Sequence, residues 1–396
     1  MSRRNLIKSA GVGFSALALS DPLWRFVAPT YAQASGGTGN LLVLCQLDGG
    51  LDALSFLAPY TNSVYHTKRP QLGLSASEVV PLANNNVYGI NNLLPFFQQL
   101  YAQNQCAIIQ QVGYPGSNQS HFESQEIFEF GVRNLASSAS ASLPWFERLR
   151  KRYFDQPYGV LDTQRVGDPR SYGYPDTTYR RAAQEAFGRL AELKRNHENN
   201  SDMQNHVIDA YSRIDVASTD IRDRTADFTS TGTARGEFFR AAALASADLG
   251  TQILKVRYGG FDTHGSQRVA EQTLFPRINN EFQQFVADLQ TLGMWQRTAI
   301  LFYTEFGRRN AENGSPGTDH GYGGHMILCG PGVRGGELYG QRVTTSDLQQ
   351  GSLPAYVDFR AVFSSCIRDW LGFDPRPIFQ LNGETYDEDP GGVLFT

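Results

Sequence analysis

The feature that most constrains the fold is a series of four apolar, strand-like runs, each followed by a polar motif. The runs cover residues 40–47, 106–112, 252–258 and 298–303, and helix-like segments separate them. A continuous apolar run that stops at glycine is typical of a strand buried on both faces. Strands that alternate with helices predict an α/β fold, in which a mostly parallel central sheet carries helices on both faces.

The polar motifs all follow the carboxyl ends of these strands. In chain order they read LDGGLDALS, GYPGSNQSHFESQ, GGFDTHGSQ and TEFGRRNAENGS, and GTDHGYGGH follows at residues 317–325. Because the carboxyl ends of parallel strands lie at one edge of a sheet, where ligands bind, we expect the motifs to meet there. A protein with a purely structural role has no need of this arrangement.

Carboxylate and imidazole side chains are frequent in these motifs, which favours a site for Zn²⁺, Mn²⁺ or Fe²⁺. The set is large enough for one or two ions. A two-metal site would clamp the attacking and leaving oxygens of a displacement at phosphorus or sulfur. The candidate ligands are Asp48, Asp52, Asp262, His264, Glu305, Asp319, His320 and His325.

Each candidate also has a purely structural interpretation. An aspartate two residues before a histidine, as at Asp262, often forms a turn. Asp48 and Asp52 can cap the helix that follows them. Glu305 can form an ordinary ion pair with Arg308. The shared position of the motifs at one sheet edge favours the metal site over these alternatives.

Ser120 is a candidate nucleophile at the start of a predicted helix. Glu123, three residues later, completes the pattern of a capping box. A hydroxyl at a helix N-terminus beside a metal ion suits phosphoryl or sulfuryl transfer, and a plain N-cap serine is the equal alternative. The sequence has no G-x-S-x-G motif, and adjacent Ser120 and His121 argue against a Ser-His-Asp hydrolase. Arg308 is predicted to bind an anionic substrate bidentately.

Residues 1–34 have the pattern of a twin-arginine signal peptide, with Ser-Arg-Arg, an apolar stretch and an Ala-x-Ala end. An amphipathic N-terminal helix is the alternative. The apolar stretch is too short, and too rich in Gly, Ala and Ser, to span a bilayer stably. The sequence therefore predicts export to the periplasm or the medium by the twin-arginine translocase. That route carries folded proteins, which favours a cofactor bound before export.

Residues 35–396 are predicted to form a single domain with a helical and polar excursion around 142–235. Removing the signal takes away four basic residues and one acidic residue, which leaves 31 basic and 38 acidic residues and a net charge of −7. This mildly acidic balance, without a basic block, excludes a nucleic-acid partner. The four cysteines lie far apart and form no zinc ribbon, although two of them can pair after export.

The motifs in this order, together with the twin-arginine start and DFRAVFSSCIRDWLG, resemble the exported bacterial family catalogued as domain of unknown function fifteen-oh-one. The resemblance covers nearly the whole mature chain, and its most specific part is EFGR…ENGS…GTDHG. That family belongs to the alkaline phosphatase/sulfatase-like superfamily of metal-dependent hydrolases and transferases. The resemblance implies an alkaline phosphatase-like α/β sandwich with a metal site at the carboxyl edge of the sheet.

The resemblance also implies roles for single residues. Asp52 matches the early strand-end aspartate, and Asp319-His320 matches the adjacent Asp-His pair. Asp262 with His264 matches the pair of the other metal. His325 is the candidate for the last histidine, which the superfamily usually places much later in the chain. CGPGV at residues 329–333 ends in Val, so it departs from the C-x-P-x-R motif of formylglycine sulfatases.

The leading hypothesis is an exported hydrolase of phosphate or sulfate esters that uses one or two divalent ions, with zinc favoured and manganese or iron as alternatives. Its substrate would be a small anionic ester or a polysaccharide, and the cleaved protein would have no stable membrane span. The alternative is a non-catalytic envelope protein that keeps the fold to bind a partner or a polysaccharide.

Overall fold

The computed structural model describes residues 39–83, 85–134, 143–154, 158–163, 220–221, 223–381 and 384–396. All of them belong to one compact unit, Gln33–Thr396. The predicted signal peptide and most of the helical and polar excursion expected around 142–235 lie outside the described residues. Within the described part, no helix is both long and apolar enough to cross a bilayer.

The centre of the fold is an eight-stranded sheet with the order β10-β5-β9-β8-β1-β7-β6, and β11 pairs with β5 beside this path. Its strands are β1 (Leu41–Leu47), β5 (Cys106–Gly113), β6 (Val160–Asp162), β7 (Ile253–Tyr258), β8 (Thr298–Tyr303), β9 (Gly324–Cys329), β10 (Leu338–Gly340) and β11 (Val357–Asp358). All neighbouring pairs are parallel except those that include β9. The predicted α/β class with a mostly parallel sheet is therefore confirmed.

β9 runs antiparallel to both of its neighbours, β5 and β8. The chain leaves β8 after Tyr303 and enters β9 at Gly324 without an intervening helix. Parallel neighbours need a long crossover, whereas a chain that turns back at the same edge pairs antiparallel. The segment 304–323 therefore begins and ends at the edge where β1, β5 and β7 also finish.

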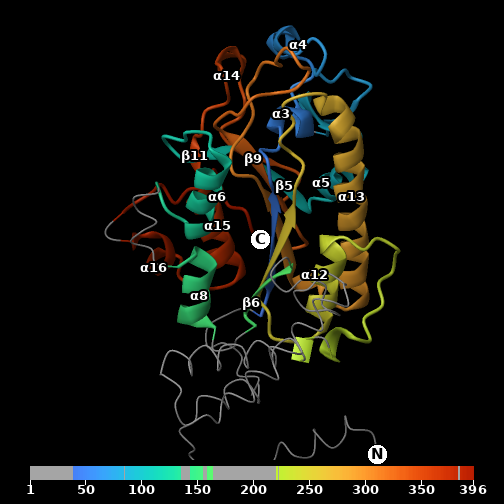
Figure 1. Ribbon diagram of the computed structural model, residues 1–396, viewed down its shortest axis with the longest axis vertical. Coiled ribbons are helices and arrows are strands. Elements are labelled where there is room, and N and C mark those ends of the chain that lie inside the picture. The colour runs from blue at the N-terminus through green and yellow to red at the C-terminus, as the bar shows by residue number, and fades with distance from the viewer. Residues whose placement is uncertain are drawn as a thin grey trace, which may run out of the picture. The chain divides into compact units, whose positions relative to one another are not determined.

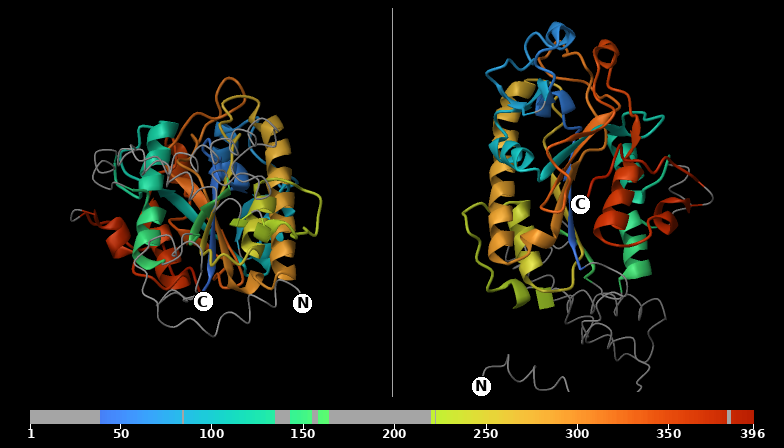
Figure 2. Two further views of the ribbon diagram at one scale, coloured as in Figure 1. Left: turned by 60° about the horizontal axis from the view of Figure 1, so that its bottom comes forward. Right: turned by 180° about the vertical axis from the view of Figure 1, so that it is seen from behind.

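Helices cover both faces of the sheet (Figures 1 and 2). One group is α5 (Pro95–Ala102), α12 (Glu237–Ser246) and α13 (Gln267–Thr291), and the other is α6 (His121–Phe130), α8 (Trp145–Tyr153) and α15 (Phe359–Ser365). Alternate residues of a strand point to opposite faces, so Val43 and Cys45 enter one core whereas Leu42 and Leu44 enter the other. The continuous apolar runs in the sequence thus serve two hydrophobic cores at once.

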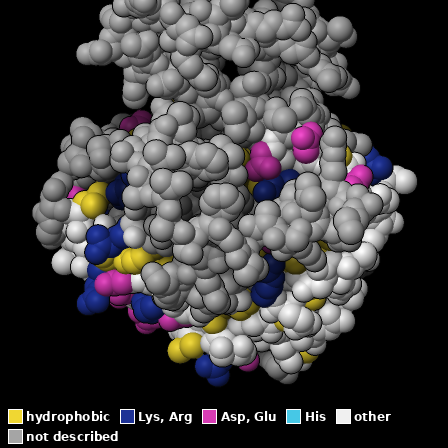
Figure 3. Space-filling view, turned by 90° about the horizontal axis from the view of Figure 1, so that it is seen from below, with side chains coloured by type: hydrophobic (Ala, Val, Ile, Leu, Met, Phe, Trp, Pro, Cys, Tyr) yellow, Lys and Arg dark blue, Asp and Glu magenta, His cyan; other side chains and the backbone are white. Residues whose placement is uncertain are grey.

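A second, three-stranded antiparallel sheet of order β2-β4-β3 lies between β1 and α5 in the sequence. Its strands are β2 (Leu57–Ala58), β3 (Val79–Leu82) and β4 (Asn85–Asn91). The other described elements are α3 (Ala53–Phe56), α4 (Ser63–Lys68), η2 (Trp295–Arg297), α14 (Thr345–Gln349), η3 (Cys366–Trp370) and α16 (Arg376–Phe379). On the face drawn in Figure 3, described basic and acidic side chains are interspersed, in keeping with the mild net charge.

The capping box predicted at the start of α6 is not formed. Ser120 is the N-cap residue, but its side chain makes no capping hydrogen bond. Instead Asn118 accepts a hydrogen bond from the backbone N–H of Ser120 at 3.0 Å, and its amide donates to Glu123. The helix therefore begins where the sequence predicts, while Asn118 replaces the Ser120 hydroxyl as the partner of Glu123.

Candidate metal centre

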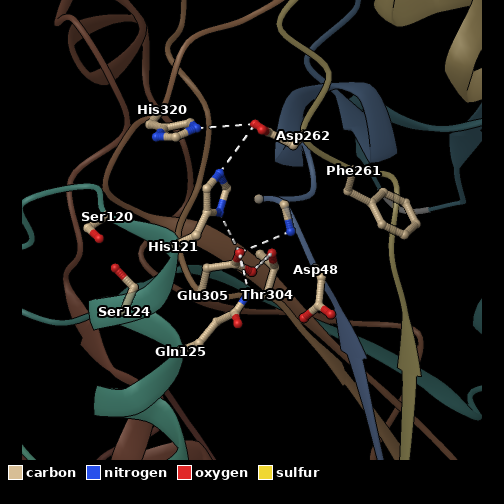
Figure 4. A network of polar contacts seen from close by, with 12 residues as sticks. Asp48, Ser120, His121, Ser124, Gln125, Phe261, Asp262, Thr304, Glu305 and His320 are labelled. Atoms are coloured by element: carbon tan, nitrogen blue, oxygen red, sulfur yellow. Dashed lines mark hydrogen bonds and ion pairs between the residues drawn. The ribbon is translucent and has the colours of Figure 1, made fainter. Parts of the chain in front are cut away.

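Polar side chains from separate strand ends converge at the carboxyl edge of the sheet (Figure 4). His121 is the first residue of α6, just beyond β5, and Asp262 follows β7. His320 comes from the segment between β8 and β9, four residues before β9 begins. The ligand atoms of these three residues all lie within 4.8 Å of one another. We call His121, Asp262 and His320 the metal cluster.

The imidazoles approach a single carboxylate oxygen. Asp262 Oδ1 lies 3.2 Å from His320 Nε2 and 3.4 Å from His121 Nε2. His264 Nε2 lies 3.0 Å from the same oxygen, and 2.9 Å from His320 Nε2. His264 therefore adjoins the metal cluster as a fourth side chain.

Each histidine is oriented through its other ring nitrogen. His121 Nδ1 lies 2.8 Å from the carboxylate of Glu305, and His264 Nδ1 lies 3.3 Å from that of Asp319. His320 Nδ1 lies 2.8 Å from the carbonyl of Gln119. Carbonyl and carboxylate oxygens accept hydrogen bonds, so Nδ1 carries the proton and the Nε2 lone pair faces the metal cluster. This is the tautomer that binds metal through Nε2.

These contacts fit a bound divalent ion. Ligands about 2.05 Å from one tetrahedral zinc ion are about 3.3 Å apart, close to the 3.0–3.4 Å between Asp262 Oδ1 and the three Nε2 atoms. The Nε2 lone pairs of His264 and His320 face each other at 2.9 Å, an arrangement that a cation between them would stabilise. His121 Nε2 is buried and makes no hydrogen bond within the described residues. The side chains therefore provide a donor set that zinc, manganese or iron can use.

More than half of the chain matches the model of a known protein family. Residues 153–380 match the family described as "Protein of unknown function (DUF1501)", which is more than half of the 396 residues. The chain belongs to the DUF1501 family. The predicted resemblance is thereby confirmed. The matched region includes Asp262 and His320, whereas His121 precedes it.

The DUF1501 chain is also similar to solved structures. One is described as Ps i-CgsB in complex with k-i-k-neocarrahexaose, with 11% identity, a TM-score of 0.37, and coverage of 78% of this chain and 70% of that one. Lipoteichoic acid synthase LtaP from Listeria monocytogenes has 12% identity, a TM-score of 0.32, and coverage of 76% and 68%. Alkaline phosphatase from the Antarctic bacterium TAB5 has 12% identity, a TM-score of 0.29, and coverage of 74% and 92%. A comparison with curated proteins gives no match.

The protonation states of Asp262 and His320 suit metal binding at neutral pH. Burial opposes the ionisation of Asp262, but the hydrogen bond and the positive charge of Arg308 outweigh it and lower the pKa of Asp262 to about 2. Burial also lowers the pKa of His320, and it outweighs the opposite effect of the Asp262 carboxylate. The carboxylate is therefore ionised and this imidazole neutral, the forms that ligate a metal.

Glu305 lies behind His121 and orients it. Its buried carboxylate accepts hydrogen bonds from the backbone of Gly49 at 3.0 Å, from Gln125 at 3.1 Å and from Thr304 at 3.1 Å. The same Oε1 that accepts from Gly49 also contacts His121. Glu305 was a candidate ligand, but in the structure its carboxylate contacts the ring of His121 and lies outside the metal cluster.

Arg308 differs most from its predicted role. Its side chain is fully buried, and it donates to protein acceptors on all sides. These acceptors are the carbonyls of Gly49, Gly50, Phe261 and Thr318 and the carboxylate of Asp262. A guanidinium has five N–H groups, and this set leaves no exposed pair for a substrate. The predicted binding of an anion by Arg308 therefore does not fit this structure. Arg308 instead forms hydrogen bonds to the loop after β1, the loop after β7 and the segment 304–323.

Asp52 also lies outside the metal cluster. Its buried carboxylate pairs with Arg69 at 2.5 Å and accepts from Gln267 at 2.6 Å and Ser55 at 2.9 Å. It is the N-cap residue of α3, which is the structural alternative that the sequence left open. Because these partners use its oxygens, the predicted metal role of Asp52 does not fit. Asp48, the other strand-end aspartate, forms an ion pair with Arg257.

His325, another predicted ligand, lies inside β9 and is only 1% exposed. Neither ring nitrogen has a hydrogen-bond partner among the described residues. His325 is not part of the metal cluster. The last histidine of the GTDHGYGGH motif therefore belongs to the core, because the chain has already entered the sheet at Gly324.

Burial of His325 should make the protein less stable in acid. Burial lowers the pKa of His325 to about 4, whereas a histidine in an unfolded chain has a pKa of about 6.5. As the pH falls through this window, the unfolded state takes up the proton first, so the free energy of unfolding decreases. The expected loss between pH 7 and pH 4 is about 3 kcal/mol.

Urea unfolding at several pH values, for the wild type and for His325→Leu, measures this effect. We expect the substitution to remove most of the decrease between pH 6.5 and pH 4. An equal decrease in both proteins would assign the acid sensitivity to other groups.

The sequence singled out His121 only as a neighbour of Ser120. The sequence does contain an indication that His121 belongs to the site. It lies in a polar motif after a strand, as Asp262 and Glu305 do. Histidine at the first position of a helix that follows a buried strand points toward the same edge. Applying the strand-end criterion to every titratable residue would have included it.

Proposed function

We propose that this DUF1501 protein is an exported, metal-dependent hydrolase of phosphate or sulfate esters. His121, Asp262 and His320 would hold the ion, with His264 as a fourth ligand or a close neighbour. The observation that carries the proposal is the convergence of the Nε2 atoms on Asp262 Oδ1, while each Nδ1 faces a fixed acceptor. Such orientation of both ring nitrogens is typical of metal-binding histidines.

Solvent access favours a catalytic over a structural ion. The side chain of Asp262 is 48% exposed and that of His264 is 44% exposed. Structural zinc sites are closed by four protein ligands, whereas catalytic sites keep one position open to water or substrate. An open donor set at the carboxyl edge of the sheet therefore supports an enzyme.

The charges favour one ion over two. The buried guanidinium of Arg308 lies 2.6 Å from Asp262 Oδ1, the oxygen that the imidazoles share. A fixed positive charge at this position takes the place that a second cation would need, because two cations repel at such distances. Among the described residues, the metal cluster is also the only group of three or more potential ligands close enough together to hold an ion.

A bound ion would supply Lewis-acid polarisation of the ester oxygen. The chain would supply the orientation of its ligands, through Glu305 and Gln119, and a nucleophile. Ser120 precedes the ligand His121 directly, and its hydroxyl makes no capping bond to α6. Backbone N–H groups at the first turn of α6 could hold the oxygens of the anionic ester. We therefore propose Ser120 as the nucleophile.

Substitution of Ser120 by alanine tests this role. We expect unchanged metal content and hydrolysis reduced by about 1000-fold or more, because the attacking group is lost. The measurement combines metal analysis of protein purified without chelator with a panel of phosphomonoesters, phosphodiesters and sulfate esters, including sulfated polysaccharides. Ser117→Ala, in the same loop, is the matched control. Equal activity of the two variants would remove Ser120 from the mechanism and leave water as the nucleophile.

The same purification separates the enzyme from the alternative class. A stoichiometric ion with turnover of at least one ester supports the hydrolase. The alternative is favoured if no metal copurifies and no added metal raises the midpoint of thermal unfolding. The protein would then be an envelope protein that binds a partner or a polysaccharide. Export by the twin-arginine route to the periplasm or medium stays a proposal from residues 1–34.

A further inference from the structure

Two of the four cysteines are direct neighbours across the central sheet. Cys106 is the first residue of β5, Cys329 is the last residue of β9, and the two are register partners. The backbone N–H of Gly330 donates to the carbonyl of Gln105 at 2.9 Å, so the hydrogen bond joins the residues that flank the pair. This pattern identifies Cys106 and Cys329 as a non-hydrogen-bonded pair.

The geometry of such a pair suits a covalent link. Residues in non-hydrogen-bonded pairs have their Cα atoms about 4.5 Å apart, at the lower end of the range of about 4.4–6.8 Å found for disulfides. Both side chains belong to the same hydrophobic core, so they point to the same face of the sheet. Burial raises the pKa of the Cys329 thiol well above its usual range, and contact with the Cys106 thiol raises it further.

We propose that Cys106 and Cys329 form a disulfide when this chain folds in the presence of a thiol oxidant. In the structure, both residues are free, buried thiols. Because both side chains are 0% exposed, an oxidant reaches them before the sheet closes or when the strands separate. The modification is thus controlled by the redox conditions of folding.

The chemistry is a thiol–disulfide exchange with a small-molecule disulfide such as oxidised glutathione. The thiolate of one cysteine attacks a glutathione sulfur, which forms a mixed disulfide and releases one glutathione thiolate. The second cysteine then attacks the protein sulfur of the mixed disulfide and releases the other glutathione. The two cysteine protons end on two glutathione molecules, so the pair loses two electrons and the oxidant gains them.

The other two cysteines are placed where they cannot compete. Cys45 lies in β1 and is paired in register with Val256 of β7 and Phe302 of β8, so β8 separates it from Cys329. Cys366 belongs to the core on the opposite face of the sheet. The structure therefore predicts a single disulfide with one connectivity.

The disulfide would join β5 and β9, the two strands next to which His121 and His320 lie. His121 lies beyond the carboxyl end of β5, and His320 lies just before the start of β9. Cys106 and Cys329 join the same two strands at the opposite end, and a register shift between Ile109 and Val112 lies in between. A disulfide at this end would hold β5 and β9 in register while the irregular part near the site keeps its shape.

The test is refolding of the full chain from denaturant in a buffer of reduced and oxidised glutathione. Free thiols are then alkylated under denaturing conditions and counted by mass. We expect the count to fall from four to two, with peptide mapping that joins Cys106 to Cys329. The oxidised form should also melt about 3–6 °C higher than the reduced form.

Cys45→Ala with Cys366→Ala should keep the disulfide, whereas Cys106→Ala should leave three free thiols. Four free thiols in refolded wild-type protein with native near-UV circular dichroism would overturn the proposal. So would a disulfide that uses Cys45 or Cys366 in comparable yield. Because the mapping is done on wild-type protein, a variant that fails to fold does not affect the result.

Discussion

Replacing Asp262 by asparagine is expected to lower the affinity for Zn²⁺ by more than about 100-fold. Loss of a residue that only orients a ligand costs about 10- to 100-fold, and Asp262 is a direct contact of the three imidazoles. Asparagine keeps the shape of the side chain but removes the negative charge. The imidazoles would then face a neutral amide in place of the carboxylate that now lies 3.0–3.4 Å from them.

Competition with a chromophoric chelator measures this affinity. Asp319→Asn, which changes a partner that His264 Nδ1 shares with the Asn313 amide, should weaken binding by about 10-fold. Asp374→Asn, at a surface ion pair with Arg376, should leave affinity unchanged. If Asp262→Asn and Asp374→Asn bind zinc equally well, the ion is not held by the metal cluster and the proposed function loses its main support.

Replacing Arg308 by methionine is expected to destabilise the fold by about 3–5 kcal/mol. The buried guanidinium is the donor for four backbone carbonyls and for Asp262, and methionine donates to none of them. Removing one partner of a buried polar network leaves the other groups desolvated and without hydrogen bonds. The cost is much larger than for an exposed ion pair, because exposed groups can bind water.

Urea unfolding at neutral pH in the presence of a chelator isolates this effect from metal binding. Arg309→Met is the matched control, since Arg309 is the exposed neighbour, and it should change stability by less than about 0.5 kcal/mol. Arg308→Lys should lie in between, because one ammonium cannot reach all five acceptors. Equal stability of the Arg308→Met and Arg309→Met proteins would mean that the guanidinium does not hold these loops.

The sheet and the edge where the site lies were predictable from the sequence. Apolar runs such as residues 298–303 identify buried strands, and the order of strands and helices indicates a parallel sheet. That regularity alone places Asp262 and Glu305 at one edge. The direction of β9 was not predictable, because a short apolar run has the same pattern in a parallel and an antiparallel strand.

The division of roles among the site residues depends on contacts that residue type does not reveal. Asp52 and Asp262 both follow strands, yet the first pairs with Arg69 and the second faces the histidines. Arg308 follows a strand end as a substrate-binding arginine would, but the carbonyls of neighbouring loops surround it. These distinctions arise from tertiary contacts, which join residues only 10 positions apart for Arg308 and Thr318 and 58 positions apart for Asp262 and His320.

The segment between β8 and β9 leaves and re-enters the sheet at one edge, and its two limbs pack backbone against backbone. A Cβ atom on Gly307 would lie 2.0 Å from the carbonyl oxygen of Gly323, and one on Gly321 would lie 2.6 Å from the backbone of Arg308. Contacts this short exclude every other amino acid at these positions unless the loop opens. Directed evolution of this site for new substrates should therefore keep these glycines fixed and vary the exposed positions between them.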